Sequence, residues 1–140
     1  MVAIQLRREH FLALVDHARE TAPAECCGLL GGTTSAEAES IYKLRNVTST
    51  PESGYEAAPE DLFAAQRQMR ARGEELLAIY HSHPRAANPS PSETDVRLAY
   101  YPDATYLIVG LGGEKPVVKA FRISERERSW HPVEYVITGE

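Results

Sequence analysis

The stretch from Leu76 to Pro84 reads Leu-Leu-Ala-Ile-Tyr-His-Ser-His-Pro, and it restricts the fold more than any other part of the sequence. Its apolar first part predicts a central strand over residues 76–81, because such a run is typical of a strand covered on both faces. Residues two apart on an extended strand point to the same face. We therefore expect the imidazoles of His81 and His83 to lie together, with their Cα atoms about 6.6 Å apart.

A second group of polar residues follows after a proline-bearing loop over residues 85–91. Ser92 and Asp95 have the spacing of a capping box, which favours a short helix from Pro91 to about Tyr100. Asp95 could also reach the two histidines, and two histidines with one carboxylate are typical of a catalytic zinc site that keeps a position for water. The two hypotheses are compatible, since a helix N-terminus can hold the backbone while its side chains face a metal.

The other segments predict a mixed α/β fold with about eight strands and about three helices, in a single domain over residues 1–140. Two further helices are expected over residues 8–21 and 59–72. Strands are expected over residues 2–6 (as an edge strand), 25–32, 41–47, 105–111, 117–123 and 130–137, with one more starting at Tyr55 and a loop over 33–40.

Composition excludes several classes of protein. The 140 residues are 43% hydrophobic, as in a soluble globule, and the net charge of −5 argues against nucleic acid as a partner. The sequence contains no apolar run of about 18 residues and no secretory signal pattern, so we expect no membrane span. Cys26 and Cys27 are adjacent and form neither a disulfide framework nor a Cys-x-x-Cys pair, which favours the reducing cytoplasm.

The spacing from His81 to Asp95 resembles the JAMM (MPN+) metalloproteases, whose signature is an upstream Glu, His-x-His, and a later Ser-x-x-Asp. Glu25, in the segment Pro23-Ala24-Glu25-Cys26-Cys27-Gly28-Leu29-Leu30-Gly31, matches the upstream residue. The resemblance covers nearly the whole chain. It implies a fold similar to that of cytidine deaminases, in which the first helix packs on one side of a curved mixed sheet and the shorter helices on the other.

The resemblance also implies a role for each matched residue. His81, His83 and Asp95 would bind one Zn²⁺ per chain, with a catalytic water as the fourth ligand. Glu25 would be the general acid/base, taking a proton from the water and giving it to the leaving amine. Ser92 would donate its hydroxyl proton to the oxyanion.

Among members of this family, the chain is most similar to the small bacterial hydrolases of sulfur-carrier proteins. The implied substrate is a ubiquitin-like carrier with a Gly-Gly C-terminus, and the implied reaction is hydrolysis of an amide or isopeptide-type bond there, with release of cysteine as one version. Two alternatives stay open, a non-catalytic MPN-type interaction module and a zinc hydrolase of a small-molecule amide. The oligomeric state also stays open.

The remaining candidate residues have structural interpretations. Cys26 and Cys27 are interpreted as packing residues, because nothing else in the sequence completes a cysteine–histidine pair. His10 and His17, seven residues apart, are expected on the surface of the first helix. A basic cluster, Arg67, Arg70 and Arg72, is interpreted as a solvated helix face, with docking of an acidic carrier as the functional alternative.

Overall fold

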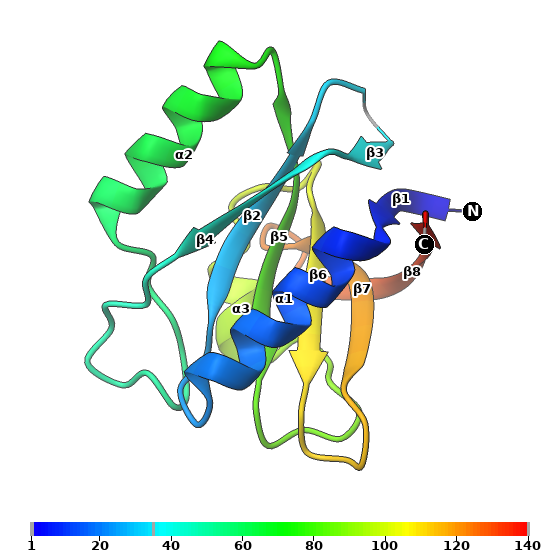
Figure 1. The fold of residues 1–140 in the computed structure, drawn as a ribbon. Coiled ribbons are helices and arrows are strands. Elements are labelled where there is room, and N and C mark those ends of the chain that lie inside the picture. The colour runs from blue at the N-terminus through cyan, green and yellow to red at the C-terminus, as the bar shows by residue number, and fades with distance from the viewer. Residues whose placement is uncertain (1, 35, 140) are drawn as a thin grey trace.

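The computed structural model describes residues 2–34 and 36–139, which form one eight-stranded mixed sheet and three helices (Figure 1). The helices are α1 (Arg8–Thr21), α2 (Pro59–Ala71) and α3 (Glu93–Arg97). The strands are β1 (Val2–Arg7), β2 (Cys27–Gly32), β3 (Glu37–Ala38), β4 (Ser40–Leu44), β5 (Glu75–His83), β6 (Thr105–Gly110), β7 (Val117–Ser124) and β8 (Ser129–Thr138). No helix within the described residues is long and apolar enough to cross a membrane.

The histidine-bearing strand β5 lies inside the sheet, whose strand order is β3-β1-β8-β7-β6-β5-β2-β4. It pairs with β6 in parallel and with β2 in antiparallel orientation. His81 is opposite Cys27 on one side and Ile108 on the other. Because both neighbours pair with the end of β5, the backbone that carries the histidines is fixed on both sides.

Each face of the sheet carries its own hydrophobic core. The core on one face includes Leu14, Val15 and Ala18 of α1, and the core on the other includes Met69 of α2 and Val96 of α3. Figure 1 shows α1 in front of the sheet and α3 behind it. The expected layering, with the first helix on one side and the shorter helices on the other, is confirmed.

The sheet differs from the expectation at two places. β1 is not an edge strand, because the two-residue strand β3 pairs with it in parallel from within the segment 33–40 that we expected to be a loop. No strand starts at Tyr55, and the chain there makes only an isolated bridge between Asn46 and Ala57. The local sequence pattern is wrong at both places, with one strand not predicted and one predicted that does not form. Pairings this short depend on the neighbouring chain rather than on their own residues.

The helix expected over residues 91–100 is much shorter in the structure. α3 covers only Glu93–Arg97, with Ser92 as an extended N-cap residue and Leu98 already outside helical geometry. Because a helix of this length is unstable alone, α3 depends on its capping box and on the burial of Val96.

Candidate metal and catalytic site

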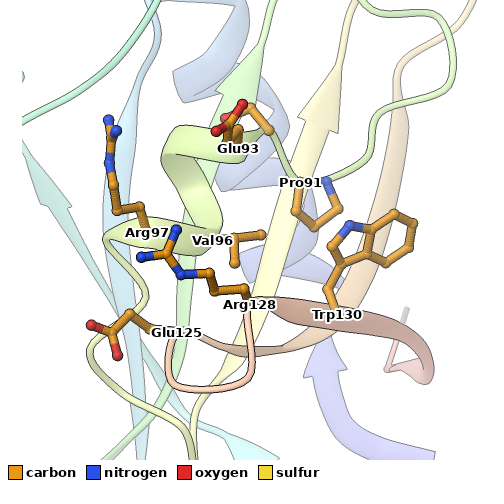
Figure 2. A pocket seen from close by; sticks show the side chains of 8 residues that line it. Pro91, Glu93, Val96, Arg97, Glu125, Arg128 and Trp130 are labelled. Carbon is orange, nitrogen blue, oxygen red and sulfur yellow. The ribbon is translucent and has the colours of Figure 1, made fainter.

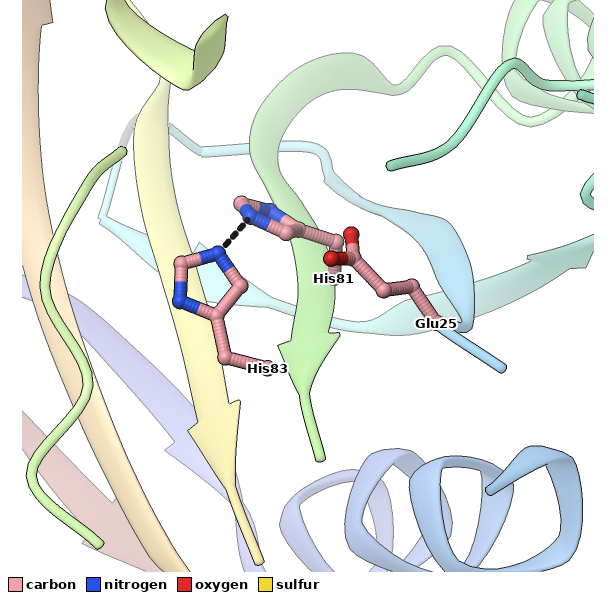
Figure 3. Close-up of side chains that lie close together, drawn as sticks. All are labelled: Glu25, His81 and His83. Atoms are coloured by element: carbon pink, nitrogen blue, oxygen red, sulfur yellow. Dashed lines mark hydrogen bonds between the residues drawn. The ribbon is translucent and has the colours of Figure 1, made fainter. Parts of the chain in front are cut away.

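The two histidines at the end of β5 face each other. His81 is 1% exposed, His83 is half-buried, and their Nε2 atoms are 3.1 Å apart (Figure 3). The ring of Tyr55 packs against the ring of His81, with centroids 4.8 Å apart and planes 31° apart. The strand spacing therefore places the imidazoles together as expected, and an aromatic contact restricts the orientation of the more buried ring.

Asp95 comes to the histidines from α3. Its Oδ2 atom lies 3.1 Å from Nε2 of His81 and 3.0 Å from Nε2 of His83. The same oxygen accepts a hydrogen bond from the backbone N–H of Ser92 at 2.9 Å, while the backbone N–H of Asp95 donates to Oγ of Ser92 at 3.0 Å. The capping box is therefore present, and it orients the Asp95 carboxylate toward the histidines.

The three converging atoms form a triangle with sides of 3.1, 3.0 and 3.1 Å. Ligand atoms around a tetrahedral ion at 2.0–2.1 Å are about 3.3 Å apart, so this triangle is close to the size that a metal ion requires. Lone pairs that converge in this way repel each other unless a proton or a cation lies between them. The donor set of two imidazoles and one carboxylate thus fits a divalent metal ion.

The charge states of these residues are coupled. Burial raises the pKa of the Asp95 carboxyl, but hydrogen bonds from His81 and His83 outweigh burial and hold the pKa below its ordinary value. Burial lowers the pKa of His83, but its hydrogen bond to Asp95 and the charge of that residue raise it overall. Asp95 is therefore ionised over a wide pH range, as a metal ligand must be.

Glu25 lies immediately before β2, with its carboxylate next to the histidines (Figure 3). One ligand atom from each of Glu25, His81 and His83 lies within 4.8 Å of the others. Glu25 is 6% exposed, and its Oε1 has no hydrogen-bond partner among the described residues. Burial raises the pKa of this carboxyl, although the charges of His81 and His83 oppose the shift. A buried carboxylate with a free oxygen and a raised pKa is suited to accept a proton.

Ser92 lies beside Asp95 on the exposed side of the site. Its hydroxyl oxygen accepts the backbone N–H of Asp95, and the structure gives its hydroxyl proton no acceptor within the described residues. The proton is therefore available to a bound group. The structure thus brings together the five residues predicted from the sequence, while their individual roles stay predictions.

Two residues that the sequence analysis did not assign to the site hold the backbone around Glu25. The side chain of Asn46 donates to the carbonyls of Glu25 and Gly54, both at 3.0 Å, and its oxygen accepts the N–H groups of Thr48 and Glu56. Asn46 therefore ties the segment that carries Glu25 to the loop between β4 and α2. No separate signal in the sequence indicated this role, because Asn46 lay within the strand expected over residues 41–47, whereas β4 ends at Leu44.

The second missed residue is Ser82, which stands between the two histidines and points to the opposite face of the sheet. Its Oγ accepts the backbone N–H of Cys26 at 2.8 Å, and its own N–H donates to the carbonyl of Cys26 at 3.3 Å. Ser82 therefore sets the distance between the histidine strand and the backbone next to Glu25. The alternation of side chains along a strand could have indicated this role.

The other residues considered from the sequence lie away from this chemistry. Cys26 and Cys27 are buried, and burial raises the pKa of their thiols to about 11 and about 12, so they have packing environments rather than those of nucleophiles. The expectation of a surface position is wrong for His10, which is 8% exposed, because it lies one turn before Leu14 on the face of α1 that packs on the sheet. It is also wrong for His17, whose Nδ1 lies 2.7 Å from the hydroxyl of buried Tyr80.

The basic cluster on α2 is divided. Arg67 and Arg70 are exposed, as expected for a solvated face. Arg72 differs, because its guanidinium donates to Oγ of Ser40 at 3.0 Å and to the hydroxyl of Tyr42 at 3.3 Å. Arg72 therefore connects the end of α2 to the sheet.

A large apolar hollow adjoins the site between α2, α3 and the sheet. It has a volume of about 530 Å³ and is lined by His81 and Asp95 together with tyrosines and aliphatic residues, among them Tyr55, Tyr106 and Ile79. We call it the apolar hollow. A ligand in it would contact the His81–Asp95 side of the site directly.

Comparison with known proteins places this geometry in a family. The model of the Prok-JAB family, described as prokaryotic homologs of the JAB domain, matches residues 7–135. The chain belongs to this family. The matched range contains the five residues of the site and all three helices.

Three relatives carry the names of enzymes. The desampylase of Haloferax volcanii is 35% identical over 106 residues, covering 72% of this chain and 76% of the relative. The CysO-cysteine peptidase of Mycobacterium tuberculosis is 32% identical and covers 94% of this chain and 90% of the relative. A probable TtuB-protein conjugate cleaving protease of Thermus thermophilus is 38% identical, with coverage of 78% and 68%.

Solved structures agree on the fold. The solution structure of a protein from Desulfitobacterium hafniense has a TM-score of 0.85 and 34% identity, covering 98% of this chain and 94% of that one. A JAB1/MPN domain protein from Archaeoglobus fulgidus has a TM-score of 0.62 at 20% identity, with coverage of 95% and 99%, and this likeness concerns the fold alone. The predicted JAMM/MPN fold class is confirmed.

Proposed function

We propose that this protein is a zinc-dependent peptidase that hydrolyses the bond after the C-terminal Gly-Gly of a ubiquitin-like or sulfur-carrier protein. The observation that carries the proposal is the triangle of His81, His83 and Asp95 with the unpartnered carboxylate of Glu25 beside it. A non-catalytic module would have no reason to keep a buried carboxylate without a partner, because that arrangement costs folding free energy. We propose one domain over residues 1–140 and a cytoplasmic site of action.

Each residue of the site has one task. His81, His83 and Asp95 would hold the zinc ion, which when bound would polarise a carbonyl and lower the pKa of water toward about 7. Glu25 would take a proton from the attacking water as its oxygen bonds to the carbonyl carbon. The same carboxyl would return the proton to the leaving nitrogen as the C–N bond breaks. Ser92 would donate its free hydroxyl proton to the carbonyl oxygen as negative charge develops there.

The surroundings of the site support a protein tail as the substrate. The apolar hollow reaches His81 and Asp95, so a C-terminal segment lying in it would present its last carbonyl to the site. Two of the relatives are named for CysO-cysteine and for TtuB–protein conjugates, which supports a carrier-protein substrate. A Gly-Gly end has no side chains, so its backbone could approach the site more closely than that of any other dipeptide.

Zinc content and cleavage measured together test the proposal. The purified protein should contain roughly one zinc per chain, and mass spectrometry should detect cleavage of a Gly-Gly-ending carrier that has an amino acid attached through an amide. Glu25→Gln should keep zinc and lose roughly 10²–10⁴-fold in single-turnover rate, while Ser92→Ala should keep zinc and lose about 10²-fold. Asp95→Asn should lose the metal, because a neutral amide is a poor zinc ligand.

Glu20→Gln is the matched control, since Glu20 is an exposed carboxylate on α1 away from the triangle. This variant should retain both zinc and rate. Loss of zinc from Glu25→Gln would make Glu25 a ligand rather than a base. Full activity in that variant would place the base elsewhere and contradict the mechanism.

A further inference from the structure

A second hollow borders the site on the side of Ser92. It has a volume of about 370 Å³ and lies between α3 and the turn that joins β7 to β8 (Figure 2). We call it the α3 hollow, and the residues that define its chemistry are Ser92, Glu93, Arg97, Glu125, Arg128 and Trp130. It shares Ser92 with the predicted catalytic residues, whereas the apolar hollow shares His81 and Asp95. The two hollows therefore adjoin different residues of the site.

The α3 hollow contains two arginines without partners. Within the described residues, neither Arg97 nor Arg128 makes a side-chain hydrogen bond or an ion pair, although Glu93 and Glu125 line the same hollow. Figure 2 shows both guanidinium groups on the side of the hollow away from Trp130. Because two glutamates balance the charge, any preference for an anion must come from the placement of the guanidinium groups, which can bind two carboxylate oxygens at once.

The backbone at Arg128 is a second, independent observation. Its φ is +52°, in the left-handed region that glycine adopts freely and that other side chains adopt at a cost. Glycine or asparagine would fit this turn position better. The chain nevertheless places an arginine here, with its side chain in the hollow. A residue that strains its backbone at a pocket is a candidate for function.

The two hollows suit different parts of a substrate. A protein tail suits the larger, apolar hollow, which reaches His81 and Asp95. The smaller α3 hollow, at about 370 Å³, is sized for a single amino acid and offers two arginines and one face of Trp130, which is 41% exposed. An amino acid joined to the carrier through its amine would have one free anionic group, its α-carboxylate.

We propose that the α3 hollow binds the α-carboxylate of a leaving group that is a single amino acid, through Arg97 and Arg128. This inference rests on the proposed function and specifies its leaving group. The oxygen of water bonds to the last glycine carbonyl carbon, the C–N bond breaks, and both protons of water end on the nitrogen, so that the products are the carrier carboxylate and a free amino acid with a protonated amine. A lysine within a protein chain has no carboxylate at this place, so isopeptide conjugates would lose the contact.

Trp130 permits a test that requires neither zinc nor activity, because it is the only tryptophan in the sequence. N-acetyl-L-alanine should change the fluorescence of the metal-free protein saturably, and N-acetyl-L-alaninamide, which lacks the charge, should not. Arg97→Gln and Arg128→Gly should each weaken the response to the carboxylate roughly tenfold or more. Arg126→Gln is the matched control, since Arg126 is an exposed arginine of the same turn that does not line the hollow.

Arg128→Gly separates binding from folding. Glycine relieves the positive φ, so the melting temperature of this variant should be equal to or above that of the unsubstituted protein. Weaker carboxylate binding in a protein that is no less stable would support the proposal. An equal response to acid and amide, or unchanged binding in both variants, would overturn it.

Cleavage of two matched substrates completes the test. One is a Gly-Gly carrier with alanine attached and a free carboxylate, and the other is the same molecule with an amidated C-terminus. The unsubstituted protein should favour the acid by roughly 10–100-fold in kcat/KM, and Arg128→Gly should reduce that ratio toward one. Equal cleavage of both would overturn the proposal. Cleavage of neither, with carboxylate-dependent fluorescence intact, would contradict the proposed function and still support the α3 hollow as a carboxylate site.

Discussion

Glu25 is held by its backbone while its carboxylate is left without a partner. Its N–H donates to the carbonyl of Pro51 at 2.7 Å, and its carbonyl accepts the amide of Asn46. The side chain is buried, yet Oε1 makes no hydrogen bond within the described residues. A buried, unpaired carboxylate destabilises a fold. This arrangement supports the proposed role of Glu25 as a proton acceptor.

Replacing Glu25 should reveal this cost as a dependence of stability on pH. Because the folded pKa is raised, the unfolded chain releases this proton first, and the contribution of Glu25 to folding falls as pH rises through its ordinary value. In metal-free protein, Glu25→Gln should therefore have about the same free energy of unfolding as the unsubstituted chain near pH 4 and a larger one at pH 7. Each unit of raised pKa corresponds to about 1.4 kcal/mol. Urea denaturation at the two pH values measures the difference.

Glu20→Gln is again the control, because an exposed carboxylate should give no such gain between pH 4 and pH 7. A variant at Glu25 that is less stable than the unsubstituted protein at pH 7 would mean that the ionised carboxylate is stabilised in the fold. The interpretation of Glu25 as a buried base without a stabilising partner would then be wrong.

At the scale of elements, the ring of Tyr80 on β5 lies so close to Gly28 on β2 that it leaves no room for a side chain at Gly28. A Cβ on Gly28 would lie 2.2 Å from ring atoms of Tyr80. Tyr80 is fully buried, and its hydroxyl is hydrogen-bonded to His17 of α1. The ring therefore has no free space to move into, and its strand is the one that carries His81.

Gly28→Ala should accordingly destabilise the protein by about 1–3 kcal/mol, the usual cost of overpacking a core. Chemical denaturation measures the loss. Gly54→Ala is the matched control, because a Cβ there meets no atom within 4 Å and its φ is not positive. Equal stability of both variants would show that Tyr80 can shift, and that the strand pair is less rigid than its contacts indicate.

The same scale explains which parts of the molecule the sequence could predict. The apolar run before His81 and the periodicity of α1 and α2 depend on local pattern, and these elements form where expected. β3 depends on pairing with β1, and the local pattern predicted a loop there. The short α3 depends on its capping box and on burial against the sheet, and the local pattern predicted a helix that is too long. The His81, His83 and Asp95 cluster was predictable because strand alternation and a capping box fix side-chain directions.

The supports of the site were less predictable. Asn46 bonds backbone groups that are up to 21 residues away, and Ser82 bonds the backbone of Cys26, 56 residues away. Neither contact follows from periodicity, since it depends on which loop lies beside which strand. The positions of buried His10 and half-buried His17 were missed for a related reason, because the packed face of α1 is wider than its apolar stripe.

For the whole molecule, the site joins segments that are distant in sequence: the chain before β2, the end of β5 and the start of α3. His81 and Asp95 come from a sheet strand and from a helix of only five residues. An ion bound by His81, His83 and Asp95 would therefore connect the sheet to α3 and would bind the folded state alone. Binding of this kind stabilises a protein in proportion to the logarithm of the free ligand concentration.

Zinc should therefore raise the melting temperature of chelator-treated protein. The free energy of unfolding should increase by about 2.7 kcal/mol when free zinc is 100 times its dissociation constant. Asp95→Asn should lose this increment. Because the substitution also weakens the capping box, the decisive quantity is the difference with and without zinc rather than the stability of the metal-free variant. His131→Ala, at an exposed histidine on β8, should keep the full increment. An undiminished zinc response in Asp95→Asn would remove Asp95 from the metal site and leave Glu25 as the third ligand.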